Sequence, residues 1–360
     1  MRWPHFAVLA SPTNLLVFVL SAQLRFIIAC TVMAHWLHFP VTQLLAYSAV
    51  PVLEPASPGA AAIRHLFIIV LLICSAIFLI VVGLIIISLL RFRAHGSAPP
   101  LQNFWNHRAE IGWTIPPVLI VLFLAVVSAK LIVNEERGPE FSSPEAGNAD
   151  LTVVGHQWWW EVRYAGTNAV TANEIHIPIG RKLRVQIDSA DVIHSFWLPQ
   201  LGPKKDMIPG WHNFVWLEAD RAGIYDGACT EFCGDQHAWM RFIVIAEDES
   251  QYQTWLTHQS EMAPIPTSPA AKAGMNIFFA QTCANCHAIS GTSAVANAAP
   301  DLTHLATRRD LAAGVISNTP ENLRRWLADP QQIKPGCKMP NFGFNNDQLD
   351  HLLAYLETLR

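Results

Sequence analysis

Residues 229–240 read CTEFCGDQHAWM, so that two cysteines, a histidine and a methionine fall within one short segment. Thiolate, imidazole and thioether groups form the soft donor set that selects copper. A single-copper site needs only one cysteine, whereas two thiolates can bridge two copper ions that share one electron. We therefore predict a dinuclear copper site; the alternative is a disulfide beside an incidental histidine. The donors predicted from these residue types are His194, Cys229, Cys233, His237 and Met240.

The sequence around this segment alternates between apolar and polar residues, as in residues 174–177 and 183–187. Short alternating runs separated by Gly and Pro are typical of β-strands in a sandwich or barrel. We expect residues 135–247 to form an all-β domain in which a histidine at a strand end reaches the cysteine-containing segment.

A second pair of cysteines occurs in the string CANCH. This spacing is that of c-type haem attachment, in which Cys283 and Cys286 form thioether bonds and His287 is an axial iron ligand. We predict Met339 as the second axial ligand, because a thioether raises the haem potential. Met275 is the alternative, and we interpret it as a core residue.

The sequence downstream of residue 247 changes in two steps. Residues 248–270 contain three prolines among Ala, Ser and Thr, which predicts a linker. Beyond it, Thr319-Pro320 is typical of a helix start. Residues 271–360 are therefore expected to form a small all-α domain, whose final helix has an apolar face of Leu349, Leu352, Leu353, Leu356 and Leu359.

The first part of the chain is strongly apolar. Over 360 residues, 51% are hydrophobic and only 14% are charged, which indicates that part of the chain lies in lipid. Apolar runs at about residues 63–90 and 111–133 are each long enough to cross a bilayer as a helix. We expect residues 51–134 to form a transmembrane hairpin.

The charges near these runs predict the topology. Arg91, Arg93 and Arg108 lie in the short loop between the two runs, which places that loop in the cytoplasm and both chain ends outside. We interpret residues 1–50 as a signal or leader segment; the alternatives are a retained third helix and lipoprotein processing at Cys30. The net charge of −4 gives no indication of nucleic-acid binding.

Residues 50–247 resemble subunit II of haem-copper cytochrome c oxidases, and the C-terminal domain resembles the class I cytochrome c fused to some of these subunits. The resemblance rests on residues 229–240, on the string GHQWWW of residues 155–160 and on the segment around His194. It implies a cupredoxin-like fold for residues 135–247. It also implies that Cys229 and Cys233 bridge two coppers, while His194, His237 and the weak ligand Met240 complete the site.

Further roles follow from the resemblance alone. Glu231 would bind copper through its backbone carbonyl, and its side chain would reach a magnesium ion shared with subunit I. Trp158 would be the residue through which electrons enter, whereas Trp159 and Trp160 are interpreted as packing residues. Glu110 would lie at the mouth of a proton-uptake path; the alternative is an ordinary charge at the membrane interface.

The resemblance implies a subunit that accepts electrons at haem c and passes them through the copper pair to haem in subunit I, where oxygen is reduced with proton translocation. The expected partners are subunits I and III, cytochrome c or another upstream donor, and the lipid bilayer. The expected location is the bacterial inner membrane, with the copper and haem domains on the periplasmic face. A copper-delivery or redox-sensing protein is the competing interpretation, but it would not need haem c.

Overall fold

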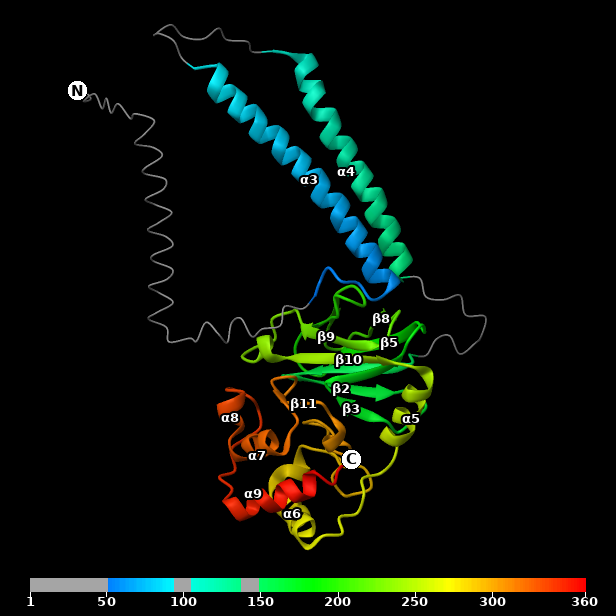
Figure 1. Cartoon of the computed structure of the whole chain (residues 1–360), viewed down its shortest axis with the longest axis vertical. Coiled ribbons are helices and arrows are strands. Elements are labelled where there is room, and N and C mark those ends of the chain that lie inside the picture. The colour runs from blue at the N-terminus through cyan, green and yellow to red at the C-terminus, as the bar shows by residue number, and fades with distance from the viewer. Residues whose placement is uncertain (1–50, 94–104, 137–148) are drawn as a thin grey trace, which may run out of the picture. The chain divides into compact units, whose positions relative to one another are not determined.

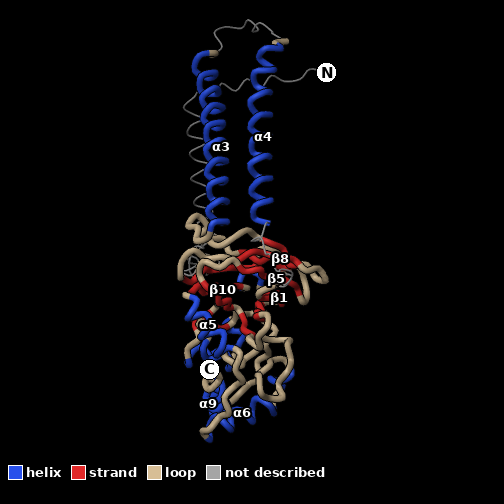
Figure 2. The backbone as a smooth tube through the Cα atoms, turned by 90° about the vertical axis from the view of Figure 1, so that its right-hand side faces the viewer, coloured by secondary structure: helices blue, strands red, loops and turns tan. Residues whose placement is uncertain are grey.

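The computed structural model describes residues 51–93, 105–136 and 149–360. Its first two elements are the long helices α3 (Pro58–Arg91) and α4 (His107–Glu136), which run side by side (Figures 1 and 2). Large apolar side chains are exposed along both helices, as expected where lipid is the solvent. The predicted transmembrane hairpin is thereby confirmed, whereas the predicted leader, residues 1–50, lies outside the described residues.

Helix α3 begins five residues earlier than its apolar run, at a cap that we did not predict. The hydroxyl of Ser57 accepts a hydrogen bond from the amide of Ala60 at 3.1 Å, and Pro58 occupies the first turn. The Ser57 hydroxyl also donates to the carbonyl of Leu201 at 2.8 Å. The cap therefore fixes the start of the helix and ties it to the following domain.

A sandwich of two five-stranded sheets follows, with strand orders β3-β2-β1-β5-β8 and β4-β10-β9-β6-β7. Figure 2 shows the strands gathered in this one region of the chain. The inner faces of both sheets form a single core, so the all-β prediction is confirmed as a sandwich. The strands are β1 (Leu151–His156), β2 (Trp159–Tyr164), β3 (Val170–Ala172), β4 (Glu174–Pro178), β5 (Leu183–Ser189), β6 (His194–Trp197), β7 (Lys205–Met207), β8 (Asn213–Leu217), β9 (Gly223–Cys229) and β10 (Arg241–Glu247).

The two alternating runs behave differently. Burial alternates along β5, as predicted, whereas every residue of β4 is buried. His176 is covered because Trp255 stacks on its ring at 3.9 Å. Glu174 is covered because its carboxylate accepts hydrogen bonds from the backbone amides of Arg309 and Asp310. The polar face of β4 is thus an internal contact surface rather than a solvated one.

The predicted linker, residues 248–270, contains a helix. Helix α5 (Glu249–Gln259) packs on the sandwich, where Tyr252 is buried in the core. After it, the amide of Ala263 donates to the carbonyl of Ser290 at 3.1 Å. The segment is therefore held at both ends, because apolar side chains at helical spacing outweigh the effect of its prolines.

The C-terminal domain is helical, as predicted, with a small two-stranded addition. Thr319 caps α7 by accepting a hydrogen bond from the amide of Asn322 at 3.2 Å. The predicted leucine face of the last helix is buried, except that Leu353 is only partly covered. The elements are α6 (Pro269–Ala280), η2 (Thr282–Asn285), η3 (Leu305–Thr307), β11 (Asp310–Leu311), β12 (Ile316–Ser317), α7 (Pro320–Ala328), α8 (Pro330–Ile333) and α9 (Asn346–Leu356).

Helices α6 and α9 cross at Gly274, where a Cβ atom would lie 1.9 Å from the backbone carbonyl oxygen of His351. We expect Gly274→Ala to destabilise the domain by about 1–3 kcal/mol, because a backbone atom cannot rotate away from the added methyl group. Thermal unfolding followed by circular dichroism measures the effect. Asn276→Ala, at an exposed position of the same helix, is the control and should change stability by less than about 0.5 kcal/mol; equal effects would contradict the prediction.

Candidate copper and haem sites

The cysteine-containing segment forms the loop between β9 and β10, which we call the ligand loop (residues 229–240). The amide of Cys229 donates to the carbonyl of Met240 at 3.0 Å, so the two ends of the loop are adjacent. Gly234 has a φ of 112°, which favours glycine, and it lets the chain turn back toward His237. A Cβ at Gly234 would also lie 3.0 Å from the indole of Trp158.

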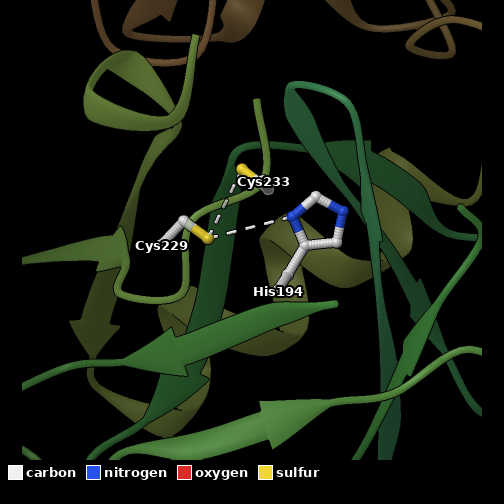
Figure 3. Close-up of side chains that lie close together, drawn as sticks. All are labelled: His194, Cys229 and Cys233. Atoms are coloured by element: carbon white, nitrogen blue, oxygen red, sulfur yellow. Dashed lines mark hydrogen bonds between the residues drawn. The ribbon is translucent and has the colours of Figure 1, made fainter. Parts of the chain in front are cut away.

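The structure brings the predicted donors together around the two cysteine sulfurs, which lie 3.8 Å apart. Figure 3 shows both sulfurs with His194 beside them. The Cys229 sulfur lies 3.8 Å from Nδ1 of His194 and 3.2 Å from the carbonyl oxygen of Glu231. The Cys233 sulfur lies 3.6 Å from Nδ1 of His237 and 3.8 Å from the sulfur of Met240. Each thiolate thus has its own imidazole and its own weaker donor.

These distances fit a metal site better than a disulfide. A disulfide joins its sulfurs at about 2.05 Å, whereas both cysteines are free thiols here. Metal–thiolate and metal–imidazole bonds of about 2.3 and 2.0 Å span donor separations of this size. The soft donor set fits copper.

Asp191 orients His194, a role that the sequence did not reveal. Its carboxylate lies 2.8 Å from Nε2 of the buried imidazole and accepts hydrogen bonds from the amides of Gln157 and Val192. Burial raises the pKa of Asp191, but these hydrogen bonds outweigh it and lower the pKa. Nδ1 of His194 is left facing Cys229, as a metal ligand requires. The only sequence signal was a carboxylate three residues before the histidine.

The two cysteine sulfurs lie close enough for one thiol to donate a hydrogen bond to the other. The hydrogen bond from Cys233 lowers the pKa of Cys229 to about 3, and the same contact raises the pKa of Cys233. A thiolate pair at this separation repels unless a cation lies between the sulfurs. The arrangement is therefore suited to metal ions between the two sulfurs.

Loss of the Asp191 carboxylate should weaken metal binding. We expect Asp191→Ala to reduce copper affinity by about 10- to 100-fold, because His194 loses the partner that orients its ring. Copper titration of the purified full chain, followed by its visible absorption, measures this change. Asp188→Ala is the control, because Asp188 pairs with His212 at 2.7 Å and not with a predicted ligand. Unchanged affinity in Asp191→Ala would contradict the assignment.

The haem-attachment residues line a cavity of about 230 Å³. Cys283, Cys286 and His287 contribute from the turn after α6, and Met339 contributes from the segment after α8. Met275 instead packs against the helical core and is not among the lining residues. The geometry therefore pairs His287 with Met339 in one cavity.

His287 is held in the tautomer that an iron ligand needs. Its Nδ1 donates to the carbonyl of Pro300 at 2.7 Å, which leaves Nε2 available. Burial lowers the pKa of His287 and keeps the ring neutral. The loop that begins at Pro300 therefore orients this histidine.

Trp158 connects the two sites. Its indole nitrogen donates to the carbonyl of Cys233 at 3.0 Å, and the residue also lines the haem cavity. Trp160 is fully buried, and Trp159 stacks on His156 at 4.2 Å. The packing interpretation of Trp159 and Trp160 is therefore confirmed.

The structure does not place the side chains of Glu110 and Glu231 in a common site. Glu110 lies in the first turn of α4, 3.3 Å from His107, whereas the sandwich meets the other end of that helix, where Lys205 pairs with Glu136. Among the described residues, the one cluster of potential ligands contains His194, Cys229 and Cys233. The magnesium role of Glu231 and the proton role of Glu110 stay predictions.

The fold defines a membrane-anchored protein that joins a cupredoxin-like sandwich to a class I cytochrome c domain. Three families match consecutive parts of the chain: the transmembrane domain of cytochrome c oxidase subunit II over residues 48–131, its periplasmic domain over residues 168–247, and cytochrome c over residues 271–360.

Two curated relatives are matched over most of this chain, and a solved domain is also similar. Cytochrome c oxidase subunit 2 of Alkalihalophilus pseudofirmus is 32% identical over 89% of this chain and 94% of its own length. The subunit 2 of Bacillus sp. strain PS3 is 32% identical over 72% of this chain and 77% of its own length. A solved periplasmic domain of subunit II of cytochrome oxidase from Bradyrhizobium japonicum is 32% identical, with a TM-score of 0.30, and covers 31% of this chain and 94% of its own.

The chain belongs to the cytochrome c oxidase subunit II family, as the resemblance predicted, and carries a fused cytochrome c domain. It is thus a component of a haem-copper terminal oxidase with a role in electron transfer. The family implies copper, and the cytochrome c domain implies haem.

Proposed function

We propose that this chain accepts electrons at haem c and delivers them through a dinuclear copper centre to haem in subunit I, where oxygen is reduced to water with proton translocation. Cys283 and Cys286 attach the haem, and His287 and Met339 ligate its iron. The copper ligands are His194, Cys229, Cys233, His237, Met240 and the carbonyl of Glu231.

The observation that carries the proposal is the pairing of donors at the two sulfurs. Cys229 has His194 and the Glu231 carbonyl beside it, and Cys233 has His237 and Met240. A single metal ion bound beside one sulfur would use one imidazole. The imidazole and the weaker donor beside the other sulfur would then have no role. Two metal ions would use every one of these donors.

The redox step is a one-electron exchange within the chain. When bound, the haem iron and the copper pair each supply a centre that gains and loses one electron. An upstream donor such as a reduced cytochrome c would supply the electron, the haem held by Cys283, Cys286, His287 and Met339 would accept it, and the copper held at Cys229 and Cys233 would take it up in turn. Trp158 provides the link, because the residue lines the haem cavity and its indole donates to the ligand loop.

The membrane arrangement follows from charge. Arg91, Arg93 and Arg108 flank the short connection between α3 and α4, so we propose that this side is cytoplasmic and that the copper and haem domains are periplasmic. On that side they face subunit I and a soluble donor, and subunit III completes the complex. Glu231 shares a magnesium ion with subunit I, and Glu110 lies at a proton-uptake path.

Metal and haem analysis of the full chain in detergent tests the proposal. We expect two coppers for each haem and an electron paramagnetic resonance spectrum of one unpaired electron shared by two copper nuclei. Cys233→Ser should lose that spectrum and keep the haem, because one thiolate cannot hold the pair. One copper with a mononuclear spectrum in the wild-type chain would favour the copper-delivery alternative instead.

Trp158→Phe should slow electron transfer from haem to copper by about tenfold or more. A phenyl ring has no N–H group, so the hydrogen bond to Cys233 is lost while the apolar packing remains. Rapid reduction of the haem followed by copper absorbance measures the rate. Trp216→Phe, on β8, is the control; a normal rate in Trp158→Phe with full copper and haem content would exclude this route.

A further inference from the structure

Lys334 is a buried cation that lies directly after α8 in the cytochrome domain. Only 3% of its surface is exposed. Its ammonium donates to three backbone carbonyls, those of Trp158 at 3.1 Å, Trp239 at 3.1 Å and Ala312 at 3.0 Å. An ammonium has three protons, so each of them has an acceptor. In the described part of the chain, no carboxylate lies within ion-pair distance of it.

The three acceptors come from different parts of the molecule. Trp158 belongs to the β1–β2 turn. Its indole N–H donates a hydrogen bond to the carbonyl of Cys233. Trp239 belongs to the ligand loop, between the predicted copper ligands His237 and Met240. Ala312 belongs to the β11–β12 turn of the cytochrome domain. One side chain therefore joins the haem domain to both segments that build the copper site.

A buried cation favours one docked arrangement over others. Burial lowers the pKa of Lys334 to about 8, so the group still carries a proton at neutral pH. Any docking that displaced the carbonyls of Trp158 or Trp239 would leave this buried charge without enough protein acceptors. A buried, hydrogen-bonded charge of this kind determines how the two domains are aligned more than how tightly they bind.

Independent contacts continue the same interface. The β11–β12 turn has positive φ angles at Ala312, Ala313 and Gly314, and it inserts against the sandwich. The amide of Arg241 donates to the carbonyl of Ala313 at 3.3 Å, and Ala313 is buried against Trp159. The cytochrome domain is therefore docked through several contacts, with Lys334 among them.

We propose that Lys334 is a positioning residue that fixes the cytochrome domain against the ligand loop, so that the haem cavity opens onto Trp158. The benefit for electron transfer rests on the function proposed above, whereas the docking itself does not. Lys334→Met is the direct test, because methionine is similar in length and cannot donate hydrogen bonds.

Hydrogen exchange of the full chain in detergent measures docking without any redox step. The amides of Arg241, Arg309 and Asp310 donate across the interface. In Lys334→Met they should exchange about tenfold faster or more, which corresponds to about 1.4 kcal/mol. Amides within β5 and α9 should not change. Lys272→Met, at an exposed position of α6, is the matched control and should exchange like the wild type.

The rate of haem-to-copper electron transfer is then measured in the same variants, together with both midpoint potentials. Faster exchange at the interface, a slower rate and unchanged potentials support the proposal. Unchanged exchange overturns the docking role of Lys334, and faster exchange with a normal rate overturns its benefit for electron transfer. A two-copper, one-haem content in the wild type keeps the proposed function intact even if the Lys334 variant behaves normally.

Loss of a buried donor can also unfold a domain, so Lys334→Arg provides a second test. Arginine keeps the charge and several donors. It should retain more protection of the cross-domain amides than Lys334→Met does. Equal loss of protection in both variants, with α9 still protected, overturns the proposal.

Discussion

The carbonyl of Cys233 accepts two hydrogen bonds, from the Gln157 amide group at 2.8 Å and from the Trp158 indole at 3.0 Å, and the copper site depends on this convergence. The strands β9 and β10 fix only the base of the ligand loop. Backbone hydrogen bonds from His237 to Gly234 and from Trp239 to Gln236 shape the second half of the loop. The β1–β2 turn adds a contact at Cys233, so the turn helps to hold this thiolate beside Cys229.

Two of the predicted metal-binding histidines, His194 and His287, are each oriented by a hydrogen bond at the ring nitrogen that would not bind the metal. His194 has a carboxylate at its second nitrogen, and His287 has the carbonyl of Pro300. In each case the second contact selects the tautomer and the ring orientation before a metal binds. The stronger acceptor, a carboxylate, lies at the predicted copper site. The weaker one, a backbone carbonyl, lies at the predicted haem site, where two cysteines would also hold the group.

The sequence predicted most of the fold and the donor set, because periodicity and local spacing are short-range signals. CANCH and the ligand loop are each contiguous. Long-range partners were not predictable in the same way. Lys334 looks like a solvated lysine in the sequence, since two of its acceptors lie 176 and 95 residues away. Helix α5 did have a local signal, the helical spacing of Tyr252, Trp255 and Leu256. The prolines after it nevertheless led to the prediction of a linker.

The connection between the sandwich and the cytochrome domain is ordered, so it does not act as a flexible tether. A flexible tether raises the effective concentration of the haem domain but leaves its orientation open. Here α5 packs on the sandwich and Ala263 is hydrogen-bonded to the haem domain, so only a short stretch between them is left to move. A short connection cannot specify orientation by itself, because it acts at one point of the interface. Orientation must come from contacts on the opposite side, around Trp158 and the β11–β12 turn, where a buried cation tolerates only one register.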